Sequence, residues 1–294
     1  MKLGFIGLGI MGKPMVKNLI GAGHEVYVYD IVKENVDAAV KTGAVACGDF
    51  GELAGNVSFI ILMLPDSPQV KEVITGEGGL LSVAKSGTLI VDMSSIAPLV
   101  AQEMAELLAN KSIRFLDAPV SGGEPKAIDG TLSVMVGGNV DDFNEAEPVL
   151  KAMAASVVHT GAVGSGNITK LANQIIVALN IAAVSEAFVL ATKAGVDPNL
   201  VFDAIKGGLA GSTVMNAKLP MMLDGNFKPG FKIDLHFKDL NNALDTAKSI
   251  GMPLFLAPQV HQMLQALRQD DCGQLDHSAL VTFYEKLAQQ KVSQ

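Results

Sequence analysis

Three polar side chains share one face of a predicted helix in the second half of the chain. Lys170, Asn173 and Gln174 are spaced i, i+3 and i+4, near the beginning of a helical run over residues 167–193. A lysine there can give a proton to an oxygen that develops negative charge, and the adjacent helix N-terminus supplies positive potential. Asn173 can hold a hydroxyl or carbonyl oxygen. Spacing alone does not distinguish this site from an ordinary exposed lysine in a first turn, so both interpretations stay open.

A second candidate site follows an apolar strand that ends at Val120. In Ser121-Gly122-Gly123, two successive glycines allow backbone N–H groups to converge on an anion, and the Ser121 hydroxyl is a further donor. These residues predict a binding site for a small carboxylate. A plain turn is the alternative that the residues leave open.

A glycine-rich loop follows the first predicted strand and opens the first predicted helix. Its sequence is Gly7-Leu8-Gly9-Ile10-Met11-Gly12. Gly7 suits a tight turn, Gly9 lets the backbone approach a pyrophosphate, and Gly12 allows close packing of helix on strand. In this strand–loop–helix context the loop predicts a dinucleotide site, with phosphate at the helix N-terminus.

An acidic residue near that loop bears on the choice of dinucleotide. Asp30 ends the second strand, 18 residues after Gly12, close to the offset expected for a ribose-binding acid. A carboxylate there accepts hydrogen bonds from a 2′-hydroxyl and repels a 2′-phosphate, which favours NAD over NADP. The nearby Lys33 weakens this argument, so NADP stays possible.

The order of apolar runs predicts two domains. Residues 1–163 alternate short apolar strands with helices, which indicates an α/β Rossmann-type domain with a parallel sheet covered on both faces. Residues 164–294 show only helical patterns and predict an all-α domain, joined to the first by the long helix over 167–193. We expect a substrate cleft between the domains. The predicted strands cover residues 2–6, 25–29, 57–64, 88–93, 113–117 and 132–136, and the later helices 200–206, 214–223, 235–250, 253–268 and 278–289.

Composition excludes several classes of protein. Of 294 residues, 49% are hydrophobic and 18% charged, which is enough to bury a large core and excludes global disorder. The net charge of -8 argues against a nucleic acid or an anionic membrane as partner. The longest charge-free apolar stretch, 171–185, is shorter than the roughly 20 residues that span a bilayer, and we expect a buried helix there.

Two further features bear on location and metal binding. Cys47 and Cys272 lie far apart, and no leader-like apolar segment precedes the first strand, so we expect no signal peptide and a cytoplasmic location. The five histidines show no paired spacing, so we expect no metal site. An apolar helical domain of this length predicts a homodimer or homotetramer.

Beyond these patterns, the sequence resembles the β-hydroxyacid dehydrogenases over essentially its whole length. The segment Phe5–Met15 with Asn18-Leu19 resembles the N-terminal signature of that family, although Val16 stands where Ser or Ala is usual. The segments Asp117–Gly123, Gly164–Gln174 and Lys238–Leu240 resemble its substrate-binding, catalytic and C-terminal cofactor-side segments. Within the family, the segments 123–127, 207–212 and 276–280 are most similar to the tartronate semialdehyde (2-hydroxy-3-oxopropionate) reductases.

The resemblance implies NAD(P)-linked reduction of 2-hydroxy-3-oxopropanoate to D-glycerate. It implies that Lys170 is the general acid or base, that Asn173 and Ser121–Gly123 bind substrate, and that Lys238, otherwise a solvated helix lysine, contacts cofactor. The cofactor-binding residues then expected are Gly7, Leu8, Gly9, Ile10, Met11, Gly12, Asp30, Leu64, Pro65, Ser95 and Lys238. The alternatives are a dehydrogenase of another small β-hydroxyacid, such as 3-hydroxyisobutyrate, and a non-catalytic dinucleotide-binding module.

Overall fold

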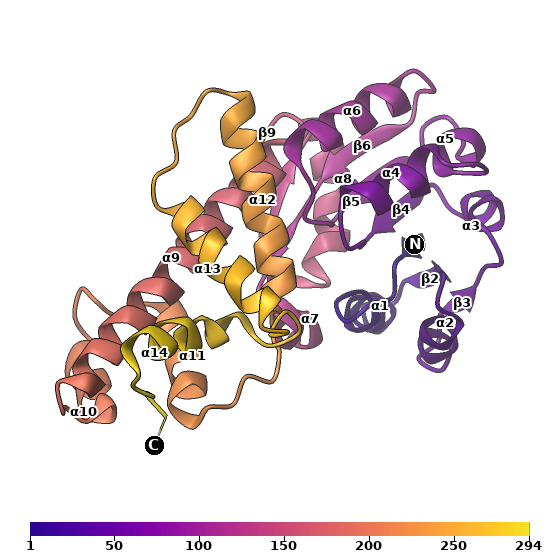
Figure 1. Cartoon of the computed structure of the whole chain (residues 1–294). Helices are drawn as coiled ribbons and strands as arrows, with labels where there is room; N and C mark the ends of the chain where they lie inside the picture. Colours follow the sequence, from indigo (N-terminus) through magenta and orange to yellow (C-terminus); the bar gives the residue numbers. More distant parts are fainter. Residues whose placement is uncertain (294) are drawn as a thin grey trace. The chain divides into compact units, whose positions relative to one another are not determined.

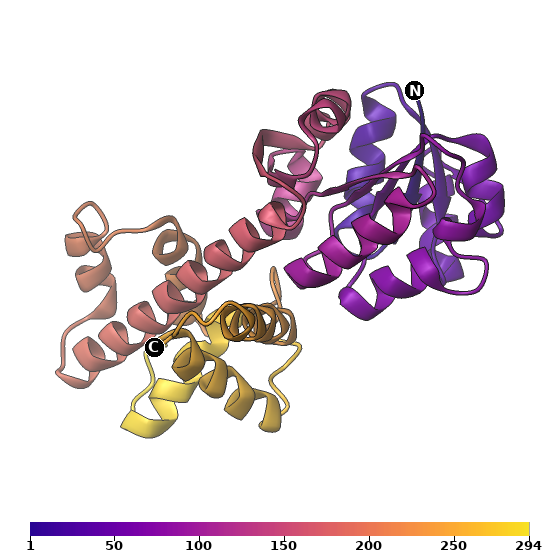
Figure 2. The ribbon, with the colours of Figure 1, turned by 90° about the horizontal axis from the view of Figure 1, so that it is seen from above.

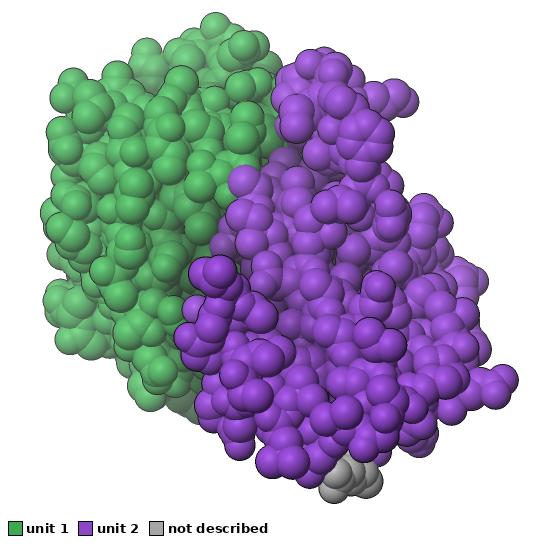
Figure 3. Space-filling view, turned by 90° about the vertical axis from the view of Figure 1, so that its left-hand side faces the viewer, with its two compact units in different colours: residues 1–170 green, residues 171–294 purple. Residues whose placement is uncertain are grey.

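The computed structural model describes residues 1–293 and divides the chain into two compact units, Met1–Lys170 and Leu171–Gln294 (Figures 1 and 3). Each unit has its own hydrophobic core. The first is built on a sheet and the second on helices, which confirms the predicted fold class.

The first unit contains a nine-stranded sheet. Its order is β3-β2-β1-β4-β5-β6-β8-β7, and β9 also pairs with β8. The first six strands are all parallel, as predicted, whereas β8 runs antiparallel to β6 and β7. The strands are β1 (Lys2–Ile6), β2 (Glu25–Tyr29), β3 (Val45–Ala46), β4 (Phe59–Leu62), β5 (Leu89–Asp92), β6 (Arg114–Asp117), β7 (Val120–Ser121), β8 (Leu132–Gly137) and β9 (Ala154–Gly161).

Apolar side chains cover both faces of this sheet. Successive residues of a strand point to opposite faces, so Phe5 packs into one core cluster and Ile6 into the other. Helices α1, α2, α7 and α8 supply residues to the first cluster, and α3, α4, α5 and α6 to the second. These helices are α1 (Gly12–Gly21), α2 (Lys33–Val40), α3 (Phe50–Asn56), α4 (Ser67–Thr75), α5 (Leu80–Val83), α6 (Pro98–Ala109), α7 (Gly123–Asp129) and α8 (Val140–Lys151).

Three strands were missing from the sequence-based prediction. Strands β3 and β7 have two residues each, too short for a period to be recognised. The apolar strand expected to end at Val120 ends at Asp117 as β6, and Val120 begins the separate strand β7. Strand β9 contains Ala155, Ser156 and an exposed Val158, and it lacks the continuous apolar run of a buried strand.

The long helix α9 (Ser165–Lys193) begins two residues before its predicted start and ends at the predicted residue. It is a continuous ribbon in Figure 2. At 1.5 Å per residue its 29 residues span about 44 Å. Among the described residues it is the one helix long and apolar enough to cross a membrane by length and composition, and only 39% of its most apolar window is buried. The expectation of a buried helix therefore holds for one side of α9 only.

The helices of the second unit enclose one apolar core. Residues of α9 such as Ile181 and Phe188 pack there with Leu219, Leu240 and Leu264. Helix α13 starts at Ala257 rather than at the predicted residue 253, with Pro258 in its first turn, where proline suits a helix start. The helices are α10 (Pro198–Ile205), α11 (Thr213–Asp224), α12 (Ile233–Ser249), α13 (Ala257–Gln269), the 3₁₀ turn η1 (His277–Leu280) and α14 (Val281–Ala288).

Candidate active site

The glycine-rich loop connects β1 to α1, as its sequence predicted. Gly7 has φ +99°, and a Cβ there would lie 2.3 Å from the Met63 carbonyl oxygen. A Cβ on Gly12 would lie 2.0 Å from the Gly7 carbonyl oxygen. Both positions therefore require glycine for the protein's own packing. A Cβ on Gly9 would meet nothing within 4 Å, and Ile10 is exposed, so this part of the loop is open to a ligand.

Asp30 follows β2 and lies against the same loop. Its carboxylate accepts hydrogen bonds from the Leu8 N–H at 2.5 Å and from the Val32 N–H at 2.7 Å. Asp30 therefore joins the end of β2 to the glycine loop, and it is half-buried rather than enclosed.

The next two strands bring the remaining cofactor candidates of this unit to the same edge of the sheet. Leu64 follows β4, and its N–H donates to the Ser94 Oγ, 2.8 Å away, in the segment after β5. Pro65 and Ser95 are the adjacent residues. Because β2, β1, β4 and β5 are parallel neighbours, their carboxyl ends lie side by side, where open α/β sheets bind ligands.

A buried carboxylate at the end of β6 holds the beginning of α9. Asp117 accepts hydrogen bonds from the backbone N–H of Gly164 at 2.7 Å and of Asn167 at 2.8 Å. Burial raises the pKa of Asp117, and these hydrogen bonds, which stabilise the charged form, act in the opposite direction. Asn167 Oδ1 also accepts from the Ile96 N–H at 3.1 Å. The first turn of α9 is thereby fixed to the carboxyl ends of β5 and β6.

Glycines allow this close approach of helix and sheet. A Cβ on Gly166 would lie 2.5 Å from the Met135 carbonyl oxygen and 2.6 Å from that of Asp117. Lys170, one turn further along α9, is buried. In the same unit, Gly122 and Gly123 adopt φ values of +134° and +67°, so the Ser121-Gly122-Gly123 segment has the glycine-dependent backbone that its sequence predicted.

The second unit contains Asn173, Gln174 and Lys238. Asn173 donates to the Gln174 Oε1 at 2.8 Å, and the Gln174 Nε2 donates to the Asp239 Oδ2 at 2.5 Å. Lys238 pairs with the Asp239 Oδ1 at 3.0 Å. Asp239 is buried and links the α9 segment that carries Asn173 to the α12 segment that carries Lys238.

Two buried histidines continue this network. The His236 Nε2 lies 3.1 Å from the Gln174 carbonyl oxygen and, since a carbonyl only accepts, this nitrogen carries the hydrogen. The Nδ1 of a neutral His236 is then an acceptor, and the His277 Nδ1, 2.9 Å away, donates to it. No group of three His, Cys, Asp or Glu among residues 1–293 is arranged to hold a metal ion.

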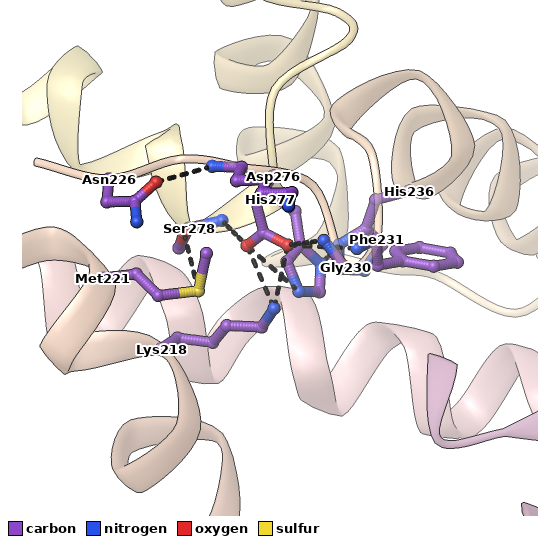
Figure 4. Close-up of polar contacts among 10 residues, drawn as sticks. Lys218, Met221, Asn226, Gly230, Phe231, His236, Asp276, His277 and Ser278 are labelled. Carbon is purple, nitrogen blue, oxygen red and sulfur yellow. Dashed lines mark hydrogen bonds and ion pairs between the residues drawn. The ribbon is translucent and has the colours of Figure 1, made fainter. Parts of the chain in front are cut away.

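Asp276, beside His277, is a structural centre that sequence reasoning missed (Figure 4). Its carboxylate accepts from the Lys218 Nζ at 3.0 Å and from the backbone N–H groups of Gly230, Phe231 and Ser278 at 2.9–3.0 Å. Burial raises the Asp276 pKa, but His277, Lys218 and the N–H donors lower it more, to about 2. The only signal for Asp276 in the sequence is its place in the 276–280 segment, and the resemblance of that segment predicts no contact.

Comparisons with known proteins match both halves of the chain. Residues 2–161 match the family described as the NAD binding domain of 6-phosphogluconate dehydrogenase. Residues 164–284 match the family described as NAD-binding of NADP-dependent 3-hydroxyisobutyrate dehydrogenase. The chain thus carries the NAD-binding domains of these enzymes, with NADP use also represented among them.

Individual relatives cover the whole chain. The 2-hydroxy-3-oxopropionate reductase of Escherichia coli is 43% identical over 293 residues, which is 100% of each chain. The 2-(hydroxymethyl)glutarate dehydrogenase of Eubacterium barkeri is 39% identical, covering 99% of this chain and 97% of the relative. The structure of 3-hydroxyisobutyrate dehydrogenase from Mycobacterium tuberculosis with L-serine is 34% identical, with a TM-score of 0.89 over 96% of this chain and 98% of that one. The chain therefore belongs to the β-hydroxyacid dehydrogenase family of oxidoreductases.

Proposed function

We propose that this oxidoreductase reduces 2-hydroxy-3-oxopropanoate to D-glycerate, in a reaction that also runs in reverse. The observation that carries the proposal is the full-length match, at 43% identity, to the Escherichia coli 2-hydroxy-3-oxopropionate reductase. The second candidate substrate is 3-hydroxyisobutyrate, favoured by the full-length structural match to the Mycobacterium tuberculosis dehydrogenase.

In this proposal, reduction needs a hydride at the carbonyl carbon and a proton at the carbonyl oxygen. The nicotinamide cofactor supplies the hydride when bound. Lys170 supplies the proton, because it is a buried lysine on a helix whose first turn is fixed by Asp117. Asn173, one turn along α9, orients the reacting oxygen, and in the reverse direction Lys170 accepts the proton.

The substrate carboxylate binds the Ser121-Gly122-Gly123 segment in this proposal. The positive φ values of both glycines give a backbone whose N–H groups can turn toward an anion, and Ser121 adds a hydroxyl. Each candidate substrate has a carboxylate and an alcohol or aldehyde carbon, so this segment does not by itself discriminate between them.

For the cofactor, we propose that the exposed part of the glycine loop receives the pyrophosphate and that Asp30 receives the ribose 2′-hydroxyl. The open space at Gly9 and the half-buried position of Asp30 support this assignment. The negative charge of Asp30 favours NADH over NADPH. Leu64, Pro65 and Ser95 flank the cofactor, and Lys238 contacts it from α12.

The test of the substrate is a panel of short semialdehydes and hydroxyacids, each assayed with both cofactors. The highest kcat/KM is expected for 2-hydroxy-3-oxopropanoate with NADH. A higher kcat/KM for methylmalonate semialdehyde, with 3-hydroxyisobutyrate preferred in the reverse direction, would replace the first candidate by the second.

The test of Lys170 is its replacement by alanine. Lys170→Ala is expected to abolish turnover on every panel member and to leave NADH binding, measured by fluorescence titration, within a few-fold of normal. Lys151→Ala is the matched control, because Lys151 is an exposed lysine that pairs with Glu147 on α8. Near-normal turnover in Lys170→Ala would contradict the assignment.

Tight NADH binding with no turnover of any panel member by the unmodified enzyme would instead favour a non-catalytic dinucleotide-binding module.

Two broader expectations remain part of the proposal. The first is that residues 1–163 bind the cofactor and residues 164–294 complete the substrate site. The second is a cytoplasmic location, with which the two free cysteines, Cys47 and Cys272, agree.

A further inference from the structure

His236 of α12 and His277 of η1 form a buried histidine pair that the proposed reaction does not use. Their Nδ1 atoms lie 2.9 Å apart, and their ring centroids 4.9 Å apart. The two residues are 1% and 5% exposed, so their contact lies away from bulk water. Phe231 packs beside both rings, with its centroid 5.8 Å from that of His236 and 5.3 Å from that of His277 (Figure 4). The three rings therefore hold one another's planes in place.

The hydrogen bonds of the histidine pair run in one direction, from η1 toward α9. Because the His236 Nε2 donates to the Gln174 carbonyl oxygen, the Nδ1 of a neutral His236 accepts from the His277 Nδ1. The His277 Nε2 lies 4.0 Å from the Asp276 Oδ1, so a proton on that nitrogen faces a carboxylate. His277 is thus a donor to His236 whether or not it carries a second proton, whereas His236 must be neutral.

Gln174 is the residue of α9 that the histidine pair holds. Its carbonyl oxygen accepts from His236, and its side-chain Nε2 donates to Asp239, one turn further along α12. Two contacts one turn apart fix both the rotation of α12 about its own axis and its height along α9. The Gln174 Oε1 in turn accepts from the Asn173 Nδ2 at 2.8 Å. The orientation of Asn173 therefore depends on how α12 is held.

The two α12 contacts also flank Lys238, which lies between them in the sequence and pairs with the Asp239 Oδ1. Without the bond from His236, α12 would be joined to Gln174 by the side chain of Asp239 alone. We propose that the histidine pair is a positioning device, which holds Asn173 and Lys238 in the orientations that the reaction needs. The inference rests on the proposed roles of Asn173 at the reacting oxygen and of Lys238 at the cofactor.

Two replacements of His277 that differ by one hydrogen bond test the proposal. In His277→Asn the amide nitrogen stands two bonds from Cβ, as Nδ1 does, and can still donate to His236. His277→Leu has the branched shape of asparagine and no donor. His277→Leu is expected to lower kcat/KM roughly tenfold or more, with a higher KM as well as a lower kcat, and His277→Asn to stay within about threefold of wild type. A purely structural role would instead reduce the fraction of active enzyme, and hence kcat, at unchanged KM.

A double-variant cycle shows whether His277 acts through His236. His236→Phe keeps a ring against Phe231 and removes both hydrogen bonds of His236. In that background His277→Leu is expected to cause no further loss of kcat/KM, because the bond that it removes is already absent. His24→Asn, at a histidine of the first unit that lies beside the chain's amino group, is the control and is expected to keep wild-type kinetics. Circular dichroism and the unfolding temperature show whether each variant is folded.

The kinetics are measured with the panel member that the wild-type enzyme turns over best, so a wrong substrate assignment does not affect the test. NADH binding is measured separately by fluorescence titration, and it is expected to be weaker in His277→Leu than in His277→Asn, since Lys238 is less firmly held. For a chain that turns over no panel member, this titration alone decides. Equal kcat/KM in folded His277→Leu and His277→Asn, or equal NADH affinity where there is no turnover, would overturn the proposal. So would losses that add in the double variant, because His277 would then act independently of His236.

Discussion

The buried side chains of Gln174 and Asp239 are joined by a hydrogen bond of 2.5 Å between α9 and α12. Asp239 also pairs with Lys238 at 3.0 Å, and Gln174 accepts from Asn173 at 2.8 Å. A single carboxylate thus connects the two residues of this unit to which we assign roles in binding substrate and cofactor.

Replacing Asp239 by alanine tests this connection. The change removes an acceptor from both Gln174 and Lys238 and is expected to lower the free energy of unfolding by about 1–3 kcal/mol. It is also expected to raise the KM for cofactor, because Lys238 loses the carboxylate that orients it. Chemical denaturation and steady-state kinetics measure the two effects. Asp245→Ala, at an exposed position of the same helix, is the control. Unchanged KM and kcat in Asp239→Ala would show that the connection is only structural.

The low pKa of Asp276 predicts a loss of stability in acid. An ordinary aspartate has a pKa of 3.8, and that of Asp276 is about 2. The folded protein therefore binds this proton less readily than the unfolded chain does. The resulting stabilisation is fully present above about pH 4 and is lost as the pH falls toward 2. Its size is about 2 kcal/mol, from 1.36 kcal/mol per pKa unit.

Asp276→Asn tests the origin of that acid sensitivity. It is expected to lower the free energy of unfolding at pH 7 by about 3 kcal/mol, because Lys218 loses its buried anionic partner. Its stability should then change less between pH 4 and pH 2 than that of the wild type. Asp203→Asn, at an exposed ion pair with Lys206, should leave the pH profile unchanged. Parallel profiles for Asp276→Asn and wild type would assign the acid sensitivity to other groups.

The sequence predicted the parts of the molecule that local patterns determine. The β1–α1 loop was predicted because its glycines are required by contacts close to the loop. A Cβ on Gly12 would meet the Gly7 carbonyl oxygen, and a Cβ on Gly7 would meet the Met63 carbonyl oxygen at the end of the neighbouring strand β4. Strands β1, β2 and β5 were predicted because apolar runs bounded by turn residues are a local signal. The end of α9 was predicted because Gly195, with φ +83°, lies two residues after the last residue of the helix, Lys193.

The contacts that no pattern predicted join residues distant in sequence. Lys218 and Asp276 are 58 residues apart, and Gln174 and Asp239 are 65 apart. Hydrogen bonds of this kind depend on which helices pack together, and a single sequence has no period that encodes the pairing. For the same reason, the sequence places Asp117 in a motif but does not predict that its carboxylate caps α9.

His261 predicts a second pH dependence, at a higher pH. Its ring stacks on Phe237 with 4.2 Å between centroids, and neither ring nitrogen has a hydrogen-bond partner among residues 1–293. Burial lowers its pKa below 6.5 and Arg268 lowers it further, while Asp245 acts in the opposite direction. Protonation is then easier in the unfolded chain. The contribution of neutral His261 to stability is therefore fully present above about pH 6.5 and decreases as the pH falls below that value.

His261→Phe is expected to reduce that dependence. A phenyl ring keeps the stacking on Phe237 and removes a buried polar group without partners, so the variant should be at least as stable as wild type at pH 8. The difference in free energy of unfolding between His261→Phe and wild type should be larger at pH 5 than at pH 8, as measured by urea denaturation at both pH values. His24→Gln, which removes a half-buried histidine, should change the profile less. An equal loss of stability in acid for His261→Phe and wild type would contradict the prediction.

Gly9 and Gly12 lie in one loop but predict opposite results when each is replaced by alanine. A Cβ at Gly12 would lie 2.0 Å from the Gly7 carbonyl oxygen, so Gly12→Ala must displace backbone and is expected to destabilise the fold by about 1–3 kcal/mol. A Cβ at Gly9 meets no protein atom within 4 Å, so Gly9→Ala should unfold like wild type. If the pyrophosphate lies against Gly9, that methyl group will nevertheless weaken NADH binding at least tenfold. Thermal unfolding without cofactor and fluorescence titration with NADH separate the two effects. If Gly9→Ala binds NADH with wild-type affinity, the pyrophosphate does not lie against Gly9 and the proposed binding position is wrong.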